Sequence, residues 1–304
     1  MIKKITLVIL SVVILLVVFK NQKQIKIEQP KEQIISVEVD YLFGFKKYDE
    51  LIETMKEWES KNPKLLDIGI YGKTDLNKDQ YYLKISNESD PGKEVVLLTA
   101  SIHGNEPWST STIMGFAGKF LSAYGKDEEI TKILNSKTIY IIPVVSPDSY
   151  PNSRNIAGID PNRNFPTEVN PNKNSITNIK NLRDFFLNIK PSAVLSGHTF
   201  GRVFLIPWGD KESESSNYED YKRIAHKMAE IADYKYKRVC ELYGHPIYGT
   251  ETDWYHRGGA FAMVMEMGNH HGKPSLEETK KELNRTYDAI LYFIKEAPKV
   301  KIIN

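Results

Sequence analysis

The chain has 304 residues, of which 41% are hydrophobic and 26% are charged, and its formal net charge is +2. These values are typical of a globular protein with one large α/β domain, and they argue against a nucleic-acid-binding protein or a strongly acidic partner. Cys240 is the only cysteine of the chain, so a disulfide framework is excluded and a metal site would have to use histidine and carboxylate ligands.

The amino terminus differs in composition from the rest of the chain. Residues 5–19 are almost all apolar and lie between lysines, a pattern typical of a signal peptide or a signal-anchor helix. No small-residue cleavage pattern ends the run, so we expect residues 1–20 to act as an uncleaved anchor, followed by a polar tether at 21–40 and a globular domain at 41–304. The domain would then lie outside the cytoplasm on the cell membrane, or would be secreted if the segment is cleaved.

Predicted helices and strands alternate along the domain. Helical spacing of apolar residues predicts helices at 46–62, 107–125, 176–189, 218–233 and 275–297. Apolar and β-branched runs predict strands at 81–86, 94–101, 137–146, 191–198, 202–208 and 259–268. Continuous apolar strands that alternate with helices predict an α/β fold with a central, mostly parallel (mixed) twisted sheet and helices on both faces.

Polar side chains stand at the ends of several predicted strands. His103 and Glu106 follow the strand at 94–101, His198 closes the strand at 191–198, and Glu266 stands near the end of the strand at 259–268. Ligand sites of such sheets collect at the carboxyl ends of the strands, so these four groups are expected near one another.

Zinc is the metal that this set of groups favours. A catalytic zinc uses three protein ligands, often two neighbours in a tight turn and one from far along the chain, and keeps one position for water. His103, Glu106 and His198 fit that plan. A His-x-x-Glu pair by itself is equally typical of a surface turn, and the neighbouring His270 and His271 are competing ligand candidates.

Two further motifs give this set a context. "NIAGIDPNRNFP" follows the strand at 137–146, and "IYGTETDWY" precedes the last strand. In this order, with HxxE before them and a strand glutamate after them, the motifs resemble the zinc carboxypeptidase family, the carboxypeptidase A-like metallopeptidases. The resemblance extends from about Tyr41 to the last predicted helix.

The resemblance implies a role for each catalytic residue. His103, Glu106 and His198 match the ligands of one zinc ion, and Glu266 matches the general base. Arg154 matches the arginine that polarises the scissile carbonyl. These roles agree with general chemistry, because a carboxylate can shuttle the proton of a zinc-activated water and an arginine can stabilise a developing oxyanion.

The resemblance also implies how the substrate is bound. Asn162 and Arg163 match the pair that holds the free carboxylate of a peptide, a task that suits the planar fork of arginine. Tyr248 matches the mobile tyrosine that closes over the bound residue. Thr252 matches the floor of the pocket for the last side chain, and its small, uncharged side chain predicts a neutral or apolar preference.

The sequence therefore predicts a zinc metallocarboxypeptidase that acts, as a monomer, on peptides with a free carboxyl terminus. Three alternatives stay open at this stage. They are a murein-peptide peptidase or amidase of the cell envelope, a deacylase related to aspartoacylase and succinylglutamate desuccinylase, and an inactive binding module. Retention of all three ligands and Glu266 argues against the last of these.

Overall fold

The computed structural model describes residues 34–87, 92–173 and 175–300, which form one compact unit from Ile35 onward. The predicted signal or anchor segment and the tether up to residue 33 lie outside the described residues. In the described part of the chain, no helix has both the length and the apolar character needed to cross a bilayer. The last residues of the predicted tether lie on the domain, since Ser36 Oγ donates to the carbonyl oxygens of Ser122 and Tyr124, at 2.9 Å each.

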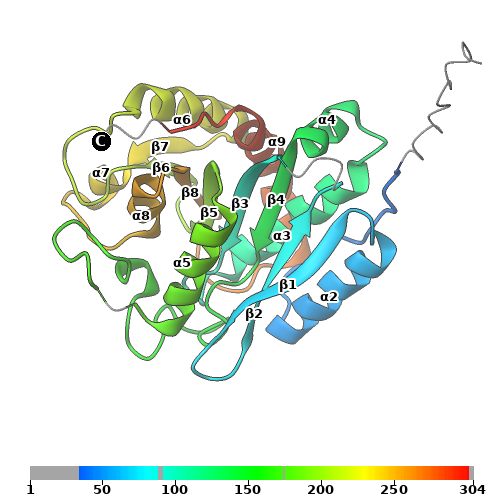
Figure 1. Ribbon diagram of the computed structural model, residues 1–304, viewed down its shortest axis with the longest axis horizontal. Coiled ribbons are helices and arrows are strands. Elements are labelled where there is room, and N and C mark those ends of the chain that lie inside the picture. Colours follow the sequence, from blue (N-terminus) through cyan, green and yellow to red (C-terminus); the bar gives the residue numbers. More distant parts are fainter. Residues whose placement is uncertain (1–33, 88–91, 174, 301–304) are drawn as a thin grey trace, which may run out of the picture. The chain divides into compact units, whose positions relative to one another are not determined.

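The described residues form one eight-stranded mixed sheet in the order β1-β2-β4-β3-β5-β8-β6-β7 (Figure 1). In chain order, the strands are β1 (Leu66–Lys73), β2 (Asp79–Ile85), β3 (Glu94–Ala100), β4 (Lys137–Ile142), β5 (Ala193–Thr199), β6 (Val203–Ile206), β7 (Lys235–Arg238) and β8 (Phe261–Met267). The four central strands β4, β3, β5 and β8 are parallel neighbours, and antiparallel pairs occur toward both edges.

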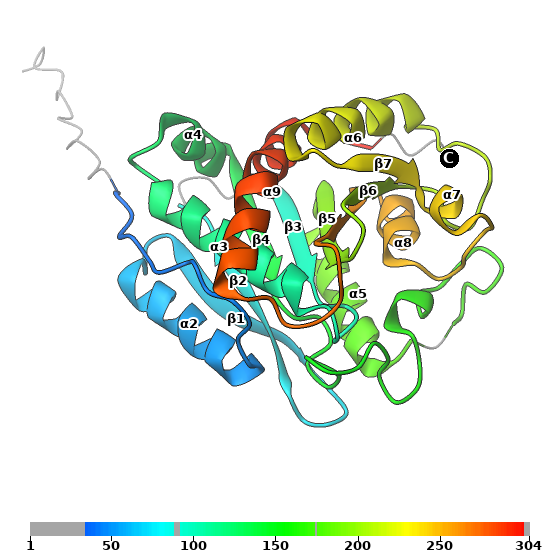
Figure 2. The ribbon, with the colours of Figure 1, turned by 180° about the vertical axis from the view of Figure 1, so that it is seen from behind.

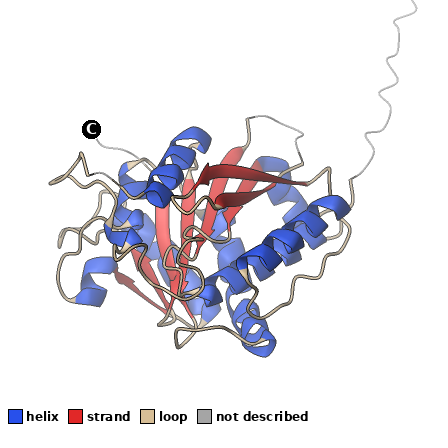
Figure 3. Ribbon diagram, turned by 90° about the horizontal axis from the view of Figure 1, so that it is seen from below, coloured by secondary structure: helices blue, strands red, loops and turns tan. Residues whose placement is uncertain are grey.

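Helices cover both faces of this sheet (Figures 2 and 3). One face carries α2 (Tyr48–Lys61), α3 (Pro107–Ala123), α6 (Tyr218–Ala232) and α9 (Leu276–Glu296), which Figure 2 shows in front of the strands. The other face carries α5 (Thr177–Ile189) and α8 (Glu251–Arg257). The remaining elements are α4 (Glu128–Ser136), the 3-10 turn η1 (Pro161–Arg163) and the short α7 (Val239–Tyr243).

The mixed α/β architecture predicted from the sequence is confirmed, and each predicted helix and strand has a counterpart in the structure. Six elements were not predicted: β1, α4, η1, β7, α7 and α8. Strands β1 and β7 lie at the two edges of the sheet, where half of each strand faces solvent, and therefore neither has a continuous apolar run. Helix α4 is short, and the carboxylate of Asp127, the residue before it, caps its first turn by accepting from the backbone N–H of Ile130.

The centre of the sheet is buried on both sides and fixes the position of the site. All seven residues of β5 are buried, as are five of seven in β3. Because β3, β5 and β8 are parallel and adjacent, their carboxyl ends open at one edge, and the turns that follow them converge there.

Candidate metal centre and active site

The turn after β3 brings His103 and Glu106 to the same point. Asn105 N–H donates to the carbonyl of Ser153 at 3.0 Å, and Glu106 N–H donates to the carbonyl of His103 at 3.2 Å. Gly104 lies so close to Ser149 that a Cβ would be 2.4 Å from its carbonyl carbon, so the chain can turn here only with glycine. Pro107 then begins α3, with its fixed φ suited to the first helical position.

His103, Glu106 and His198 form one cluster at the carboxyl edge of the sheet. Nδ1 of His103 lies 2.8 Å from Oε1 of Glu106, and Nδ1 of His198 lies 3.0 Å from Oε2 of the same carboxylate. One ligand atom from each residue lies within 4.8 Å of the others, and all three residues are buried. The predicted ligand set is therefore brought together by the structure.

Both histidines of the cluster are bound a second time, by an outer carboxylate. Nε2 of His103 lies 3.0 Å from Oδ1 of Asp160, and Nε2 of His198 lies 2.7 Å from Oε1 of Glu251. Each ring thus donates Nε2–H outward and directs Nδ1 toward Glu106. Two imidazole nitrogens and one carboxylate, with carboxylates behind the imidazoles, are a donor set that fits zinc.

The charges of the cluster stabilise one another. Although burial opposes ionisation, His198 and His103 hold the pKa of Glu106 at about 2. Although burial opposes protonation, Glu106 and Glu251 raise the pKa of His198 well above its usual value. The effect of burial on the Asp160 carboxyl group is outweighed by His103 and then by Arg154, and its pKa is therefore lowered. The cluster therefore keeps its carboxylates ionised inside a buried environment.

Glu266 behaves differently from the other acids. Burial raises the pKa of Glu266 to about 7, with the neighbouring charge of Glu106 adding to the effect of burial and His198 opposing it. Its strand β8 pairs with β5 in a register that sets Glu266 beside His198. A carboxyl group poised near neutral pH next to a metal cluster can both take up and release a proton.

Arg154 reaches the same cavity from the loop after β4. Its Nη2 and Nε donate to Oδ2 of Asp160 at 3.0 and 3.2 Å, and its Nη1 lies 3.7 Å from Oε1 of Glu106. The Arg154 side chain is 40% exposed, so part of the guanidinium faces the cavity. Its position agrees with the sequence prediction of a cation next to the metal cluster.

Asn162 and Arg163 lie on η1, at the wall of the cavity. Asp160 caps this turn by accepting from Asn162 N–H at 2.9 Å, and Asn162 Oδ1 in turn accepts from Glu251 N–H at 2.8 Å. Arg163 Nη1 donates to the carbonyl of Asn162 at 2.7 Å. Gly249 has a positive φ of 76°, and a Cβ there would lie 2.6 Å from the Arg163 carbonyl oxygen, so glycine permits the close approach of these two segments.

The far wall of the cavity is apolar. The cavity is lined there by Leu205, Val239, Ile247 and Val264, which belong to one hydrophobic cluster with Val203. Thr252 contributes to the lining with only 2% of its surface exposed. The polar groups and the apolar wall thus line the same cavity.

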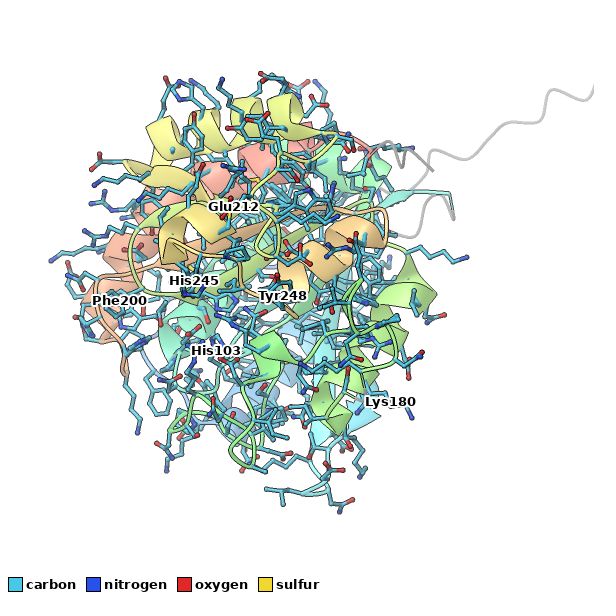
Figure 4. The ribbon with its side chains drawn as sticks, turned by 90° about the vertical axis from the view of Figure 1, so that its left-hand side faces the viewer. His103, Lys180, Phe200, Glu212, His245 and Tyr248 are labelled. Atoms are coloured by element: carbon cyan, nitrogen blue, oxygen red, sulfur yellow. The ribbon has the colours of Figure 1, made fainter. Side chains whose placement is uncertain are left out.

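The structure does not bring Tyr248 into this lining. Tyr248 is 50% exposed and lies outside the set of residues that line the cavity (Figure 4). Tyr243, at the end of α7, lines it instead, and the Cζ of Arg163 lies 5.4 Å from the Tyr243 ring centroid. Tyr248 lies in the segment between α7 and α8, and its predicted role as a mobile closing residue stays a prediction.

The competing histidines lie at the rim of the site. His271 lines the cavity, with its Nδ1 3.4 Å from Oγ1 of Thr199 and its ring edge-on to Phe200. His270 faces Glu278 at 3.4 Å on the surface. Among the described residues, the metal-type cluster is formed by the predicted ligands and includes neither of these two histidines.

Sequence reasoning missed three residues of the site: Asp160, Tyr243 and Glu251. Asp160 stands inside the motif "IDPNRNFP", next to residues that were selected, and could have been found there. Glu251 likewise stands inside the motif "IYGTETDWY", directly before Thr252, and could have been found there. Tyr243 had no signal of its own. The positions of both residues depend on how the segment 239–252 folds back over η1.

Comparisons with known proteins agree with this geometry. A family model described as zinc carboxypeptidase matches residues 51–272. The chain is 25% identical over 289 residues to carboxypeptidase A2 of Rattus norvegicus, a match that covers 80% of this chain and 69% of the relative.

Among solved structures, the chain resembles thrombin activatable fibrinolysis inhibitor with a TM-score of 0.76 at 18% identity, over 83% of this chain and 74% of that one. It also resembles carboxypeptidase A from Helicoverpa armigera with a TM-score of 0.69 at 18% identity, over 83% and 73% of the two chains. At this identity the structural likeness concerns the fold.

Proposed function

This chain belongs to the zinc carboxypeptidase family and is a zinc metallocarboxypeptidase, and we propose that it removes neutral or apolar residues from the carboxyl ends of peptides. The observation that carries the proposal is the distribution of groups around one cavity. The metal cluster, the Asn162–Arg163 pair and an apolar wall all line the same cavity.

His103, Glu106 and His198 would hold the single zinc ion. When bound, zinc supplies a Lewis acid and a water molecule that is activated at neutral pH. The outer carboxylates of Asp160 and Glu251 orient the two imidazoles for this task by accepting their Nε2–H groups.

Glu266 is the proposed general base. Its carboxylate would take a proton from the attacking water and deliver it to the nitrogen of the leaving residue. A raised pKa near 7 suits both halves of this transfer, because the group then binds and releases a proton at similar cost. The partly exposed guanidinium of Arg154 would stabilise the negative charge that develops on the carbonyl oxygen.

Asn162 and Arg163 would bind the free carboxylate of the peptide. Arginine and an amide N–H group form directional hydrogen bonds to a carboxylate, and this contact would select the last residue of a chain over internal residues. The side chain of that residue would then lie against Leu205, Val239, Ile247 and Val264, which offer no charge to pair with a basic or acidic group.

The closing tyrosine is assigned to Tyr243 in this proposal, with Tyr248 as the alternative. Tyr243 faces the cavity and packs against Arg163, whereas Tyr248 would have to move inward from an exposed position. We also propose, from the sequence, that residues 1–20 carry the catalytic domain out of the cytoplasm and that the enzyme acts as a monomer.

The test is mass spectrometry of substrates incubated with the zinc-loaded domain. The panel contains peptides with free and amidated carboxyl ends, murein peptides and N-acyl amino acids. We expect release of single apolar residues from free-carboxylate peptides. Preferred cleavage of murein peptides would instead support an envelope peptidase, release of an acyl group would support a deacylase, and the absence of any turnover would support a binding module.

A further inference from the structure

Glu251 is a buried acid within the motif "IYGTETDWY", and the sequence prediction gives it no role. It is the first residue of α8, it is 0% exposed, and the side chain of Thr250 caps the helix before it. A carboxylate in this position is expensive unless it has a charged or strongly polar partner. The partner that the structure provides is the outer nitrogen of His198.

The contact between Glu251 and His198 is short and directional. Oε1 of Glu251 lies 2.7 Å from Nε2 of His198, and Nδ1 of the same ring lies 3.0 Å from Glu106. Because Glu251 accepts from Nε2–H, a neutral His198 ring would keep its proton on Nε2, and Nδ1 would then be the nitrogen available to a metal ion in the cluster. Asp160 has the same relationship to His103, so the two imidazoles are held by matching contacts from opposite sides.

The second oxygen of the Glu251 carboxylate also indicates that this side chain is placed to contact His198. Oε2 of Glu251 is buried without a hydrogen-bond partner among the described residues. The only side-chain hydrogen bond of Glu251 among the described residues is therefore the one to His198, and a cation on the far side of that ring would strengthen this contact. A carboxylate buried for packing alone would be expected to have both oxygens bonded.

We propose that Glu251 is a positioning residue for the metal ligand His198, and that its side chain strengthens zinc binding without taking part in substrate binding. This inference rests on the proposed zinc site. The two parts of Glu251 would then have different roles. The side chain would orient His198 in the metal cluster, while the backbone N–H would orient Asn162 on the substrate side of the cavity.

The backbone of Glu251 carries the second part. Its N–H donates to Oδ1 of Asn162 at 2.8 Å, which leaves the Nδ2 of Asn162 without a partner among the described residues and free to donate into the cavity. A side-chain substitution at 251 keeps this N–H. The orientation of Asn162, and hence recognition of the peptide carboxylate, should survive the loss of the carboxylate.

The experiment compares zinc affinity, measured by competition with a chromophoric chelator at pH 7, in the wild-type protein, Glu251→Gln and Glu251→Ala. We expect the dissociation constant of zinc to rise roughly 10–100-fold in Glu251→Ala, with Glu251→Gln between this variant and wild type. At saturating zinc, the KM for a free-carboxylate peptide should remain at the wild-type value. Glu282→Gln is the matched control, since Glu282 is equally buried but is bonded to Tyr234 and the backbone of Gly268.

An unchanged zinc affinity in both Glu251 variants would overturn the inference, and so would a raised KM with unchanged zinc affinity. A second measurement needs no variant of Glu251. In the zinc-loaded protein labelled with 15N-histidine, the Nε2–H of His198 should be protected from exchange and Nδ1 should carry the metal-bound shift. Binding of zinc through Nε2 would contradict the proposal. If the wild-type protein bound no zinc at all, both the proposal on Glu251 and the proposed function would fail. If the wild-type protein bound zinc and the Glu251 variants bound it equally well, only the proposal on Glu251 would fail.

Discussion

His198 and Glu266 are register partners in the parallel pair of β5 and β8, so the third metal ligand and the proposed base leave the sheet side by side. Glu266→Gln should therefore keep the metal cluster and lose the proton transfer. We expect zinc content to remain stoichiometric while kcat falls by roughly 10²–10⁴-fold, the contribution typical of a general base. Metal analysis and steady-state kinetics of the same preparation check this. Turnover at the wild-type rate would remove Glu266 from the mechanism.

Recognition of the free carboxylate should depend on the guanidinium of Arg163. Arg163→Met removes a charged hydrogen-bond donor of the kind that contributes about 1.5–3 kcal/mol, so kcat/KM for free-carboxylate peptides should fall roughly 10–100-fold. Arg163→Lys should restore only part of the loss, because lysine cannot form the bidentate fork. The measurement is kcat/KM for paired free and amidated peptides. Arg223→Lys, on the exposed face of α6, serves as the control.

If wild-type enzyme cleaved amidated and free peptides equally well, the carboxylate would play no part in recognition. The Arg163 variants would then change the cleavage of free and amidated peptides to the same extent. That result would favour an endopeptidase or an amidase.

The preference of the enzyme for the carboxyl-terminal side chain of its substrate should change when a charge is introduced at position 252. Thr252 is almost fully buried at the cavity wall, so Thr252→Asp would place a carboxylate in a poorly solvated position where it needs a cation. We expect the variant to lose activity on apolar carboxyl-terminal residues and to gain relative activity on Lys and Arg. Competition assays with mixed peptides report the ratio directly, with Thr252→Ser as the uncharged control. A wild-type enzyme that already released Lys or Arg preferentially would contradict the proposed specificity.

Single Tyr→Phe variants should show whether Tyr243 or Tyr248 closes over the bound substrate. Removal of a hydroxyl that contacts bound substrate should raise KM or lower kcat, whereas removal of an exposed one should have little effect. We expect Tyr243→Phe to lower kcat/KM several-fold and Tyr248→Phe to leave it within about twofold. Steady-state kinetics on one blocked dipeptide are sufficient. The opposite pattern would show that Tyr248 moves inward when substrate binds.

Stability at mildly acidic pH should depend on His256. This ring is buried, its Nδ1 accepts from Tyr221 Oη at 2.9 Å, and burial lowers its pKa from 6.5 to about 4. The unfolded chain takes up a proton near pH 6.5 that the folded protein refuses, so the free energy of unfolding should fall as the pH drops from about 6.5 to about 4. A shift of this size corresponds to roughly 3 kcal/mol.

His256→Asn keeps an acceptor near Nδ1 but cannot titrate. The difference in unfolding free energy between wild type and variant, from urea titrations at several pH values, should therefore change across this window and be constant above pH 7. A difference that stays constant from pH 7 to pH 4 would show that His256 has the same pKa in the folded and the unfolded protein.

Much of the fold followed from local patterns in the sequence. The apolar runs of β3, β4, β5 and β8 are long and β-branched because these strands are buried on both faces, and this made the parallel centre of the sheet predictable. The edge strands β1 and β7 are half exposed, which removed the continuous apolar signal.

The sequence by itself was sufficient to select the candidate metal ligands and the pair proposed to bind the peptide carboxylate, since His103, Glu106, Asn162 and Arg163 occur in compact motifs and His198 and Glu266 end apolar strands. The sequence did not show which residues surround these groups in the folded protein. Glu251 meets His198 across a separation of 53 residues, and Tyr243 meets Arg163 across 80, through a loop whose path is set by packing rather than by local propensity. Ligand chemistry is thus encoded in residue type and spacing. The contacts that orient the ligands and enclose the substrate arise only when distant segments pack together.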